Sequence, residues 1–247
     1  MIRLSVNVNK IATLRNSRGG RMPSVLDAAA VCLDAGAAGI TVHPRADRRH
    51  ITPEDVRAIA SALEGKRPAI EYNIEGDPRP ELLSLVHEVR PDQCTLVPVT
   101  PGEITSQAGW GRGPAADLLP TVVRDLKARG IRVSLFVDPN RAGIELAAAV
   151  GADRVELYTE PFARAFERGP QDAEKAFAEY AAAAEAAHEF GLGVNAGHDL
   201  DLDNLQIFRR LPHLDEVSIG HAIVSRAVFD GLGPVVRQFL DVLRPVL

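Results

Sequence analysis

Residues 39–52 combine side-chain types that suit proton transfer and the binding of anions. A β-branched apolar run ends there at His43, and Pro44 stops the strand because it has no N–H for the ladder. Three arginines, an aspartate and a second histidine, His50, follow before a helix-capping signal. We expect a buried strand that carries His43 to its C-terminal end inside a cationic loop. A solvated charged turn with an incidental histidine is the alternative.

The composition is that of an ordinary globular protein. The chain has 247 residues, of which 46% are hydrophobic and 25% charged, enough for a sizeable core. A net charge of −5 gives no reason to expect nucleic acid or an anionic membrane as a partner. No apolar run has the length of a membrane-spanning helix, and the N-terminus enters a strand directly, without a signal peptide. We therefore expect a cytoplasmic protein.

Strand and helix patterns alternate along the whole chain. The predicted strands span 2–8, 38–43, 68–73, 93–97, 131–137, 154–158, 192–195 and 216–219. Long loops are predicted at 9–23, at 98–114 and between residue 158 and an alanine-rich helix at 171–190. Eight strand–helix units favour an α/β fold, a single (β/α)₈ barrel domain over residues 1–247. The runner-up is an open doubly wound sheet, but its glycine-rich fingerprint after the first strand is missing.

Barrel active sites lie at the C-terminal strand ends, and Glu71 is the informative carboxylate among the side chains predicted near them. A buried carboxylate is unfavourable unless it is paired. Glu71 is therefore either half of an internal salt bridge with an arginine or a general acid–base group whose pKa is raised by burial. The predicted position of His43 at the neighbouring strand end favours the second interpretation.

Two further strand ends carry a glycine followed by a histidine, at 195–199 and 218–222. In many barrels these loops bind phosphate through backbone N–H groups, although tight turns that need glycine are the alternative. Lys10 is the only lysine near a strand end, so Schiff-base chemistry on a lysine is not favoured. Asp138 and Glu156 belong to no ligand cluster and are assigned to hydrogen bonding. We predict proton-transfer chemistry without a metal.

Four motifs stand out in order along the chain: VNVNKIATLRNSRG (6–19), GITVHPRADRRHI (39–51), VNAGH (194–198) and IGHAI (219–223). Together they strongly resemble those of pyridoxine 5′-phosphate synthases, the ring-closing enzymes of vitamin B6 synthesis. The resemblance implies a (β/α)₈ barrel with extra helices and a homo-octamer built from dimers. It also implies a transferase reaction that condenses 1-deoxy-D-xylulose 5-phosphate with 3-amino-2-oxopropyl phosphate, releasing phosphate and water and needing no metal or organic cofactor.

Roles for individual residues follow from the same resemblance. It implies that His43 and Glu71 are proton acceptors and that His198 is the proton donor. The implied contacts of the sugar phosphate are Arg45, His50, Thr105 and the pair Asn9 and Lys10. Those of the amino ketone phosphate are Asn7, Arg18, Asp199, Gly220 and His221.

The sequence departs from the family pattern at three places. Asn9 and Lys10 replace the usual Asp-His pair, and Asp199 stands where glycine is common. The loop after the third strand also differs, so that Glu75 is a second candidate for the catalytic carboxylate. Two other functions stay open: an epimerase or isomerase of sugar phosphates, and a barrel that binds a phosphorylated ligand without turnover.

Overall fold

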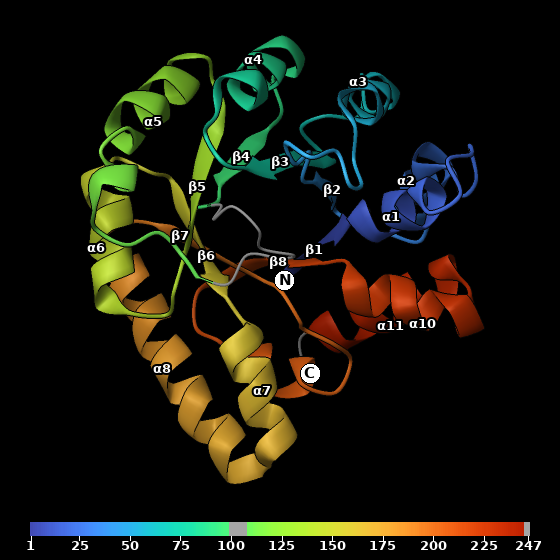
Figure 1. The fold of residues 1–247 in the computed structure, drawn as a ribbon. Helices are drawn as coiled ribbons and strands as arrows, with labels where there is room; N and C mark the ends of the chain where they lie inside the picture. Colours follow the sequence, from blue (N-terminus) through green and yellow to red (C-terminus); the bar gives the residue numbers. More distant parts are fainter. Residues whose placement is uncertain (99–107, 245–247) are drawn as a thin grey trace.

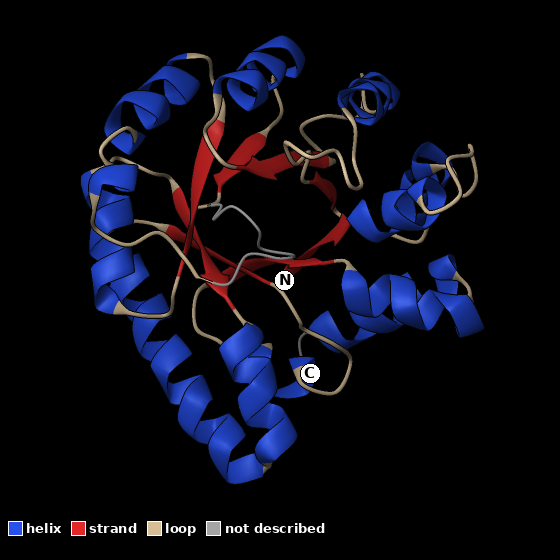
Figure 2. Ribbon diagram, viewed as in Figure 1, coloured by secondary structure: helices blue, strands red, loops and turns tan. Residues whose placement is uncertain are grey.

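The structure is a computed structural model that describes residues 1–98 and 108–244. Within these residues eight parallel strands close into a barrel in sequence order, because β1 pairs with both β2 and β8 (Figures 1 and 2). The strands are β1 (Arg3–Asn7), β2 (Gly39–Val42), β3 (Glu71–Gly76), β4 (Gln93–Leu96), β5 (Arg132–Val137), β6 (Arg154–Tyr158), β7 (Gly193–Gly197) and β8 (Leu214–Ile219). The predicted barrel is confirmed.

Helices surround the barrel on the outside (Figure 2). They are α1 (Asn9–Asn16), α2 (Val25–Asp34), α3 (Pro53–Ala62), α4 (Pro80–Val89), α5 (Leu119–Ala128), α6 (Arg141–Ala149), α7 (Glu160–Arg168), α8 (Pro170–Glu189), α9 (Leu205–Phe208), α10 (His221–Asp230) and α11 (Leu232–Leu243), with a short 3₁₀ helix at Pro114–Ala116. Local sequence explains the start of α3, where Thr52 and Asp55 form a capping box and Pro53 stands in the first turn.

The pleat of each strand separates two environments. In β1 and β2, Leu4, Val6, Ile40 and Val42 are fully buried in the main hydrophobic core. Alternate residues are polar and hydrogen-bond across strands, Ser5 with Thr41 at 2.7 Å and Thr95 with Asn73 at 3.1 Å. Because side chains two residues apart share a face, each polar row continues to the C-terminal strand end. This arrangement brings Asn7, His43 and Glu75 to the same rim.

Three predicted segments are wrong in detail. The third strand begins at Glu71 rather than at residue 68 and runs to Gly76. The predicted loop 9–23 contains α1, which buries only Ile11 and Ala12 and therefore has a weak apolar pattern. The loop predicted after residue 158 contains α7, whose start is marked by Pro161 in its first turn. The order of the strand–helix units is unaffected.

Candidate active site

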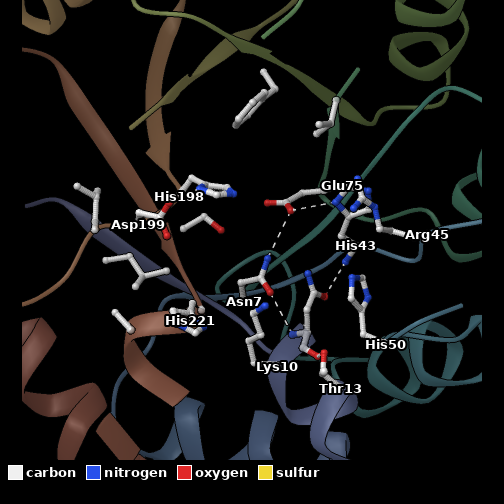
Figure 3. Close-up of a pocket in the computed structure, with 18 of the residues that line it drawn as sticks. Asn7, Lys10, Thr13, His43, Arg45, His50, Glu75, His198, Asp199 and His221 are labelled. Carbon is white, nitrogen blue, oxygen red and sulfur yellow. Dashed lines mark hydrogen bonds and ion pairs between the residues drawn. The ribbon is translucent and has the colours of Figure 1, made fainter. Parts of the chain in front are cut away.

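A cavity of about 450 Å³ opens at the C-terminal ends of the strands (Figure 3). Every strand, or the residue just after it, contributes a lining side chain: Asn7, His43, Glu75, Val97, Phe136, Glu156, His198 and Ser218. The cavity is also lined by Asn9 and Lys10 from the start of α1, by Arg45 and His50, and by Asp199, Gly220 and His221. Ten of the thirteen predicted site residues, together with the second candidate carboxylate Glu75, thus meet at one place.

His43 and Glu75 form the central pair of this cavity. The Nδ1 atom of His43 lies 3.8 Å from Oε2 of Glu75, and Asn7 donates a hydrogen bond from Nδ2 to the same oxygen at 3.4 Å. Figure 3 shows all three side chains directed into the cavity. Both His43 and Glu75 are 8% exposed, so neither group is well hydrated. Low hydration makes the charged form of each group unfavourable.

The electrostatics of the pair favour neutral groups. Burial lowers the pKa of His43 well below its usual 6.5, and the nearby positive charges of Arg45 and Arg79 act in the same direction. Burial also raises the pKa of Glu75 to about 8, with Glu216 adding to the shift and a hydrogen bond involving Ser218 opposing it. A neutral imidazole can accept a proton near neutral pH, and a carboxyl group that ionises near pH 8 can exchange one. The pair is suited to general acid–base chemistry.

Asn9 and Lys10 contribute to the cavity in different ways. Asn9 accepts a hydrogen bond from the backbone N–H of His43 at 2.9 Å, and its own N–H donates to Oδ1 of Asn7 at 3.0 Å. It therefore links the ends of β1 and β2. Lys10 lines the cavity with its side chain and brings a positive charge to the first turn of α1.

His50 and Arg45 lie beside His43 at the cavity wall. The rings of His43 and His50 are 6.3 Å apart in an edge arrangement. Burial lowers the pKa of His50 to about 4, and the positive charges of Arg45 and Lys10 contribute. His50 is thus neutral at physiological pH, and the positive charge of this wall comes from Arg45 and Lys10. Such a wall suits an anionic substrate.

Glu71 is the clearest correction to the sequence analysis. It is the first residue of β3, at the N-terminal end of the barrel, and it does not line the cavity. Its carboxylate pairs with Arg132, which also donates to Gln93 at 2.9 Å. The salt-bridge interpretation of Glu71 is therefore correct. The carboxylate at the cavity is Glu75, four residues later on the same face of the strand.

Glu156, the middle residue of β6, was assigned only to hydrogen bonding, yet it lines the cavity. Burial and the neighbouring Glu75 raise its pKa well above 4.5, while a hydrogen bond involving Thr95 opposes the shift. A carboxyl group in this state can donate a hydrogen bond to substrate. The sequence did contain a signal for this position in the cavity, because Glu156 is a carboxylate predicted near the end of a barrel strand.

The two glycine–histidine loops meet at the opposite side of the cavity. A Cβ atom on Gly220 would lie 2.6 Å from the main-chain oxygen of Asn7, and one on Gly197 would lie 2.6 Å from Oε1 of Glu156. Gly220 leaves no room for a Cβ atom because the backbone of β1 approaches it closely, and at Gly197 the space is taken by the Glu156 side chain and by the main-chain oxygen of Ser218, 3.1 Å away. His221 is the first residue of α10, whose N-terminus has no side-chain cap.

One predicted contact, Arg18, is not brought to the cavity, and another, Thr105, is not described. Arg18 is exposed in the turn after α1 and is not among the lining residues. Thr105 lies outside the residues that the structure describes.

Within residues 1–98 and 108–244, no three His, Cys, Asp or Glu side chains are grouped as metal ligands would be. No helix in the same residues is long and apolar enough to cross a membrane.

The raised pKa of Glu75 predicts how the stability of the fold depends on pH. The unfolded carboxyl group ionises near 4.5 and the folded one near 8, so between these values the folded state binds more protons. This contribution to stability is complete below pH 4.5 and is lost as the pH rises through 8. We expect Glu75→Gln to raise the melting temperature relative to the unaltered protein, with a difference that grows from pH 5 to pH 8. A difference that is constant over this range in calorimetry contradicts the assignment.

Comparison with known proteins gives a consistent result over nearly the whole length. A sequence model of the family described as pyridoxal phosphate biosynthesis protein PdxJ matches residues 4–245. A pyridoxine 5′-phosphate synthase of Christiangramia forsetii is 51% identical, covering 99% of this chain and 100% of its own. One from Leptospira biflexa is 49% identical, covering 98% and 97%.

Solved structures with a similar fold have much lower sequence identity. Phosphoribosyl anthranilate isomerase of Thermotoga maritima has a TM-score of 0.62 at 15% identity, over 98% of both chains. Thiamine phosphate pyrophosphorylase of Pyrococcus furiosus has a TM-score of 0.63 at 11% identity, over 98% of this chain and 95% of its own. At these identities the likeness is one of fold.

Proposed function

Because the chain belongs to the PdxJ family of pyridoxal phosphate biosynthesis proteins, we propose that it is a pyridoxine 5′-phosphate synthase. Its substrates are then 1-deoxy-D-xylulose 5-phosphate and 3-amino-2-oxopropyl phosphate, condensed into an aromatic ring with release of phosphate and water. The observation that carries this proposal beyond family membership is the pair of His43 and Glu75, 3.8 Å apart in one cavity with a cationic wall.

The side chains of the cavity can serve the proton transfers that this condensation needs. The substrate amine forms a Schiff base with the sugar ketone, so no lysine of the protein has to supply nitrogen. Neutral His43 accepts protons, and Glu75, whose pKa is raised to about 8, exchanges them, as the resemblance implies for His43 and for a carboxylate beside it. His198 donates a proton from the opposite wall. Glu75 takes over the role that the sequence analysis gave to Glu71.

Two helix N-termini support the binding of two phosphate groups. Helix α1 begins at Asn9 and α10 at His221, both at the cavity, and neither helix has a hydrogen bond from its N-cap side chain, although the N–H of Asn9 itself donates to Asn7. Free N–H groups and the helix dipole favour an anion at each position. Lys10 adds a positive charge at the first position, and His221 a second donor at the other. We propose that one substrate phosphate lies at each helix start.

The test of this function is a steady-state assay with both substrates and the purified protein. We expect pyridoxine 5′-phosphate and inorganic phosphate to appear together, and only when both substrates are present. Exchange of solvent protons into a single ketose phosphate, without the amine, would instead support an epimerase or isomerase. Binding of either substrate without turnover at high protein concentration would support a binding protein.

We also propose that the chain assembles into a homo-oligomer, in line with the octamer that the family resemblance implies. Apolar side chains are exposed on α10, where Phe229 is 89% and Val228 72% accessible. In Figure 1 this helix lies on one flank together with α1, α2 and α11. Exposed apolar groups at one flank favour burial against another chain.

Light scattering after gel filtration tests the assembly. We expect the unaltered protein to have the mass of several chains, and Phe229→Glu to have a smaller mass because a buried charge is unfavourable. Leu118→Glu, an exposed apolar position at the start of α5, is the matched control. A monomeric mass for the unaltered protein would contradict the proposal.

A further inference from the structure

His198 and Asp199 form a hydrogen-bonded pair at the cavity wall. The Nδ1 atom of His198 lies 2.8 Å from Oδ2 of Asp199. The two side chains are 25% and 38% exposed. Figure 3 shows them together at the end of β7, with the ring of His198 extending toward Glu75. The carboxylate therefore contacts one ring nitrogen, while the ring faces the cavity.

The backbone explains how adjacent residues can pair in this way. His198 and Asp199 have φ angles of +90° and +57°, the left-handed region that side chains other than glycine rarely adopt. Two such residues in succession turn the chain so that neighbouring side chains lie together. Asn204 holds the turn by donating from Nδ2 to the carbonyl oxygen of Asp199 at 3.0 Å. The Thr159 hydroxyl donates to the carbonyl oxygen of His198.

The ring is also fixed from its other side. The ring of Tyr158 lies 5.2 Å from that of His198 in an edge arrangement. The hydrogen bond to His198 lowers the pKa of Asp199, and the charges of His198 and His221 add to this shift. Asp199 thus stays ionised, and an ionised carboxylate favours a proton on the nitrogen that it contacts. Among the described residues, Arg164 on α7 and Glu156 in the middle of β6 are further titratable groups near the pair.

We propose that Asp199 is a positioning residue for His198, holding a proton on Nδ1 and leaving Nε2 as the atom that exchanges protons with substrate. In the protonated ring, Asp199 supports the positive charge while Nε2–H faces the cavity. The proton on Nε2 then passes to a departing hydroxyl group of the substrate. As the C–O bond breaks with its electron pair on oxygen, the proton acceptor His43 takes a proton from the neighbouring carbon, and the electrons of that C–H bond form the new double bond. Water leaves, and the imidazole of His198 becomes neutral with its Nδ1 proton still bonded to Asp199.

This inference rests on the proposed function in one respect only, because that function identifies the substrate whose hydroxyl group accepts the proton from Nε2. It assigns a purpose to the carboxylate of Asp199, for which the resemblance implied only a contact with substrate. Glycine also fits the left-handed backbone at this position, and asparagine tolerates it better than most residues. Asp199→Gly and Asp199→Asn are therefore variants that the turn can accommodate.

Nitrogen-15 NMR of the histidine rings in the substrate-free protein tests the pair without turnover. We expect the neutral His198 ring to carry its proton on Nδ1. Asp199→Asn keeps that tautomer, because the amide oxygen can still accept from Nδ1–H, whereas Asp199→Gly shifts the proton toward Nε2. A proton on Nε2 in the unaltered protein, or signals that do not respond to Asp199→Gly, overturns the proposal.

The dependence of kcat on pH provides the second readout. We expect Asp199→Asn to lower kcat roughly fivefold, as for a partly exposed ion pair, and to move the alkaline loss of activity to lower pH. KM changes less than kcat, and Asp203→Asn in the same loop leaves both unchanged. An unaltered pH profile in Asp199→Asn contradicts the role of the charge. If no product forms at all while the NMR result is as expected, the proposed function is contradicted, but the role of Asp199 in holding a proton on Nδ1 of His198 is not.

Discussion

Glu75→Gln is expected to reduce turnover by about 10²- to 10⁴-fold, the usual contribution of a positioned general acid or base. Glutamine keeps the shape of the side chain and can still accept the hydrogen bond from Asn7, which now measures 3.4 Å. It cannot take a proton from substrate or exchange one with His43. The loss should therefore appear in kcat, with substrate affinity changed little. Steady-state kinetics with both substrates measures it.

Glu71→Gln is the matched control for this prediction, because it makes the same change on the same face of β3. Glu71 pairs with Arg132 at the far end of the barrel, away from the cavity. Loss of the pair leaves the arginine without its charged partner and should lower the free energy of unfolding by about 1–3 kcal/mol. We expect kcat to remain within about twofold of the unaltered value. If Glu71→Gln loses turnover and Glu75→Gln keeps it, the correction made above is wrong.

His43→Asn is expected to have the second of the two largest effects, again a loss of about 10²- to 10⁴-fold in kcat. Its backbone N–H still bonds to Asn9, so the end of β2 keeps its place. The substituted side chain has no group that titrates near neutral pH. Burial and nearby arginines keep His43 neutral, so its loss removes a proton acceptor rather than a positive charge. Binding of the substrate phosphates should be nearly unchanged.

His213→Asn is the control for the histidine change. His213 is exposed, pairs with Glu185 before β8, and has a φ of +58°, a backbone conformation that asparagine tolerates well. We expect normal kcat and KM from this variant. Turnover by His43→Asn close to that of the unaltered protein would contradict the proton-accepting role of His43.

Several elements of the site could be predicted because their signals are local. Pro44 has no N–H to donate to a neighbouring strand, so it ends the strand. His43, the residue before it, therefore lies at the strand end. The capping box of Thr52 and Asp55 fixes the start of α3 and thereby the length of the cationic loop. The alternation of strand and helix patterns, repeated eight times, was sufficient to predict the closed barrel.

The position of a residue along the barrel axis is not a local property. Glu71 and Glu75 are four residues apart, so they share one face of β3 in any register. Which of them lies at the cavity depends on pairing with the neighbouring strands, where Glu71 aligns with Gly39 and Glu75 with Thr95. The predicted strand lay three residues too early in the sequence. That shift was enough to place Glu71, rather than Glu75, near the C-terminal end of β3. The pairing partners are distant in sequence, so no local pattern contains this information.

Helix α1 was missed for a related reason, because contacts from elsewhere in the chain stabilise it. Arg15 pairs with Asp55 of α3 at 2.5 Å, and Asn9 bonds to the backbone of His43. The apolar pattern of the segment alone is weak, and most helical stability in proteins comes from tertiary packing.

The sequence by itself determined the barrel, the strand end that carries His43 and the loops that carry His198 and His221, since each depends on residues adjacent in the chain. Only the tertiary structure decided that Glu75 and not Glu71 faces His43, that Arg18 lies away from the cavity, and that Asp199 contacts the ring of His198. These are distances set by strand register and backbone turns, and a linear pattern specifies neither.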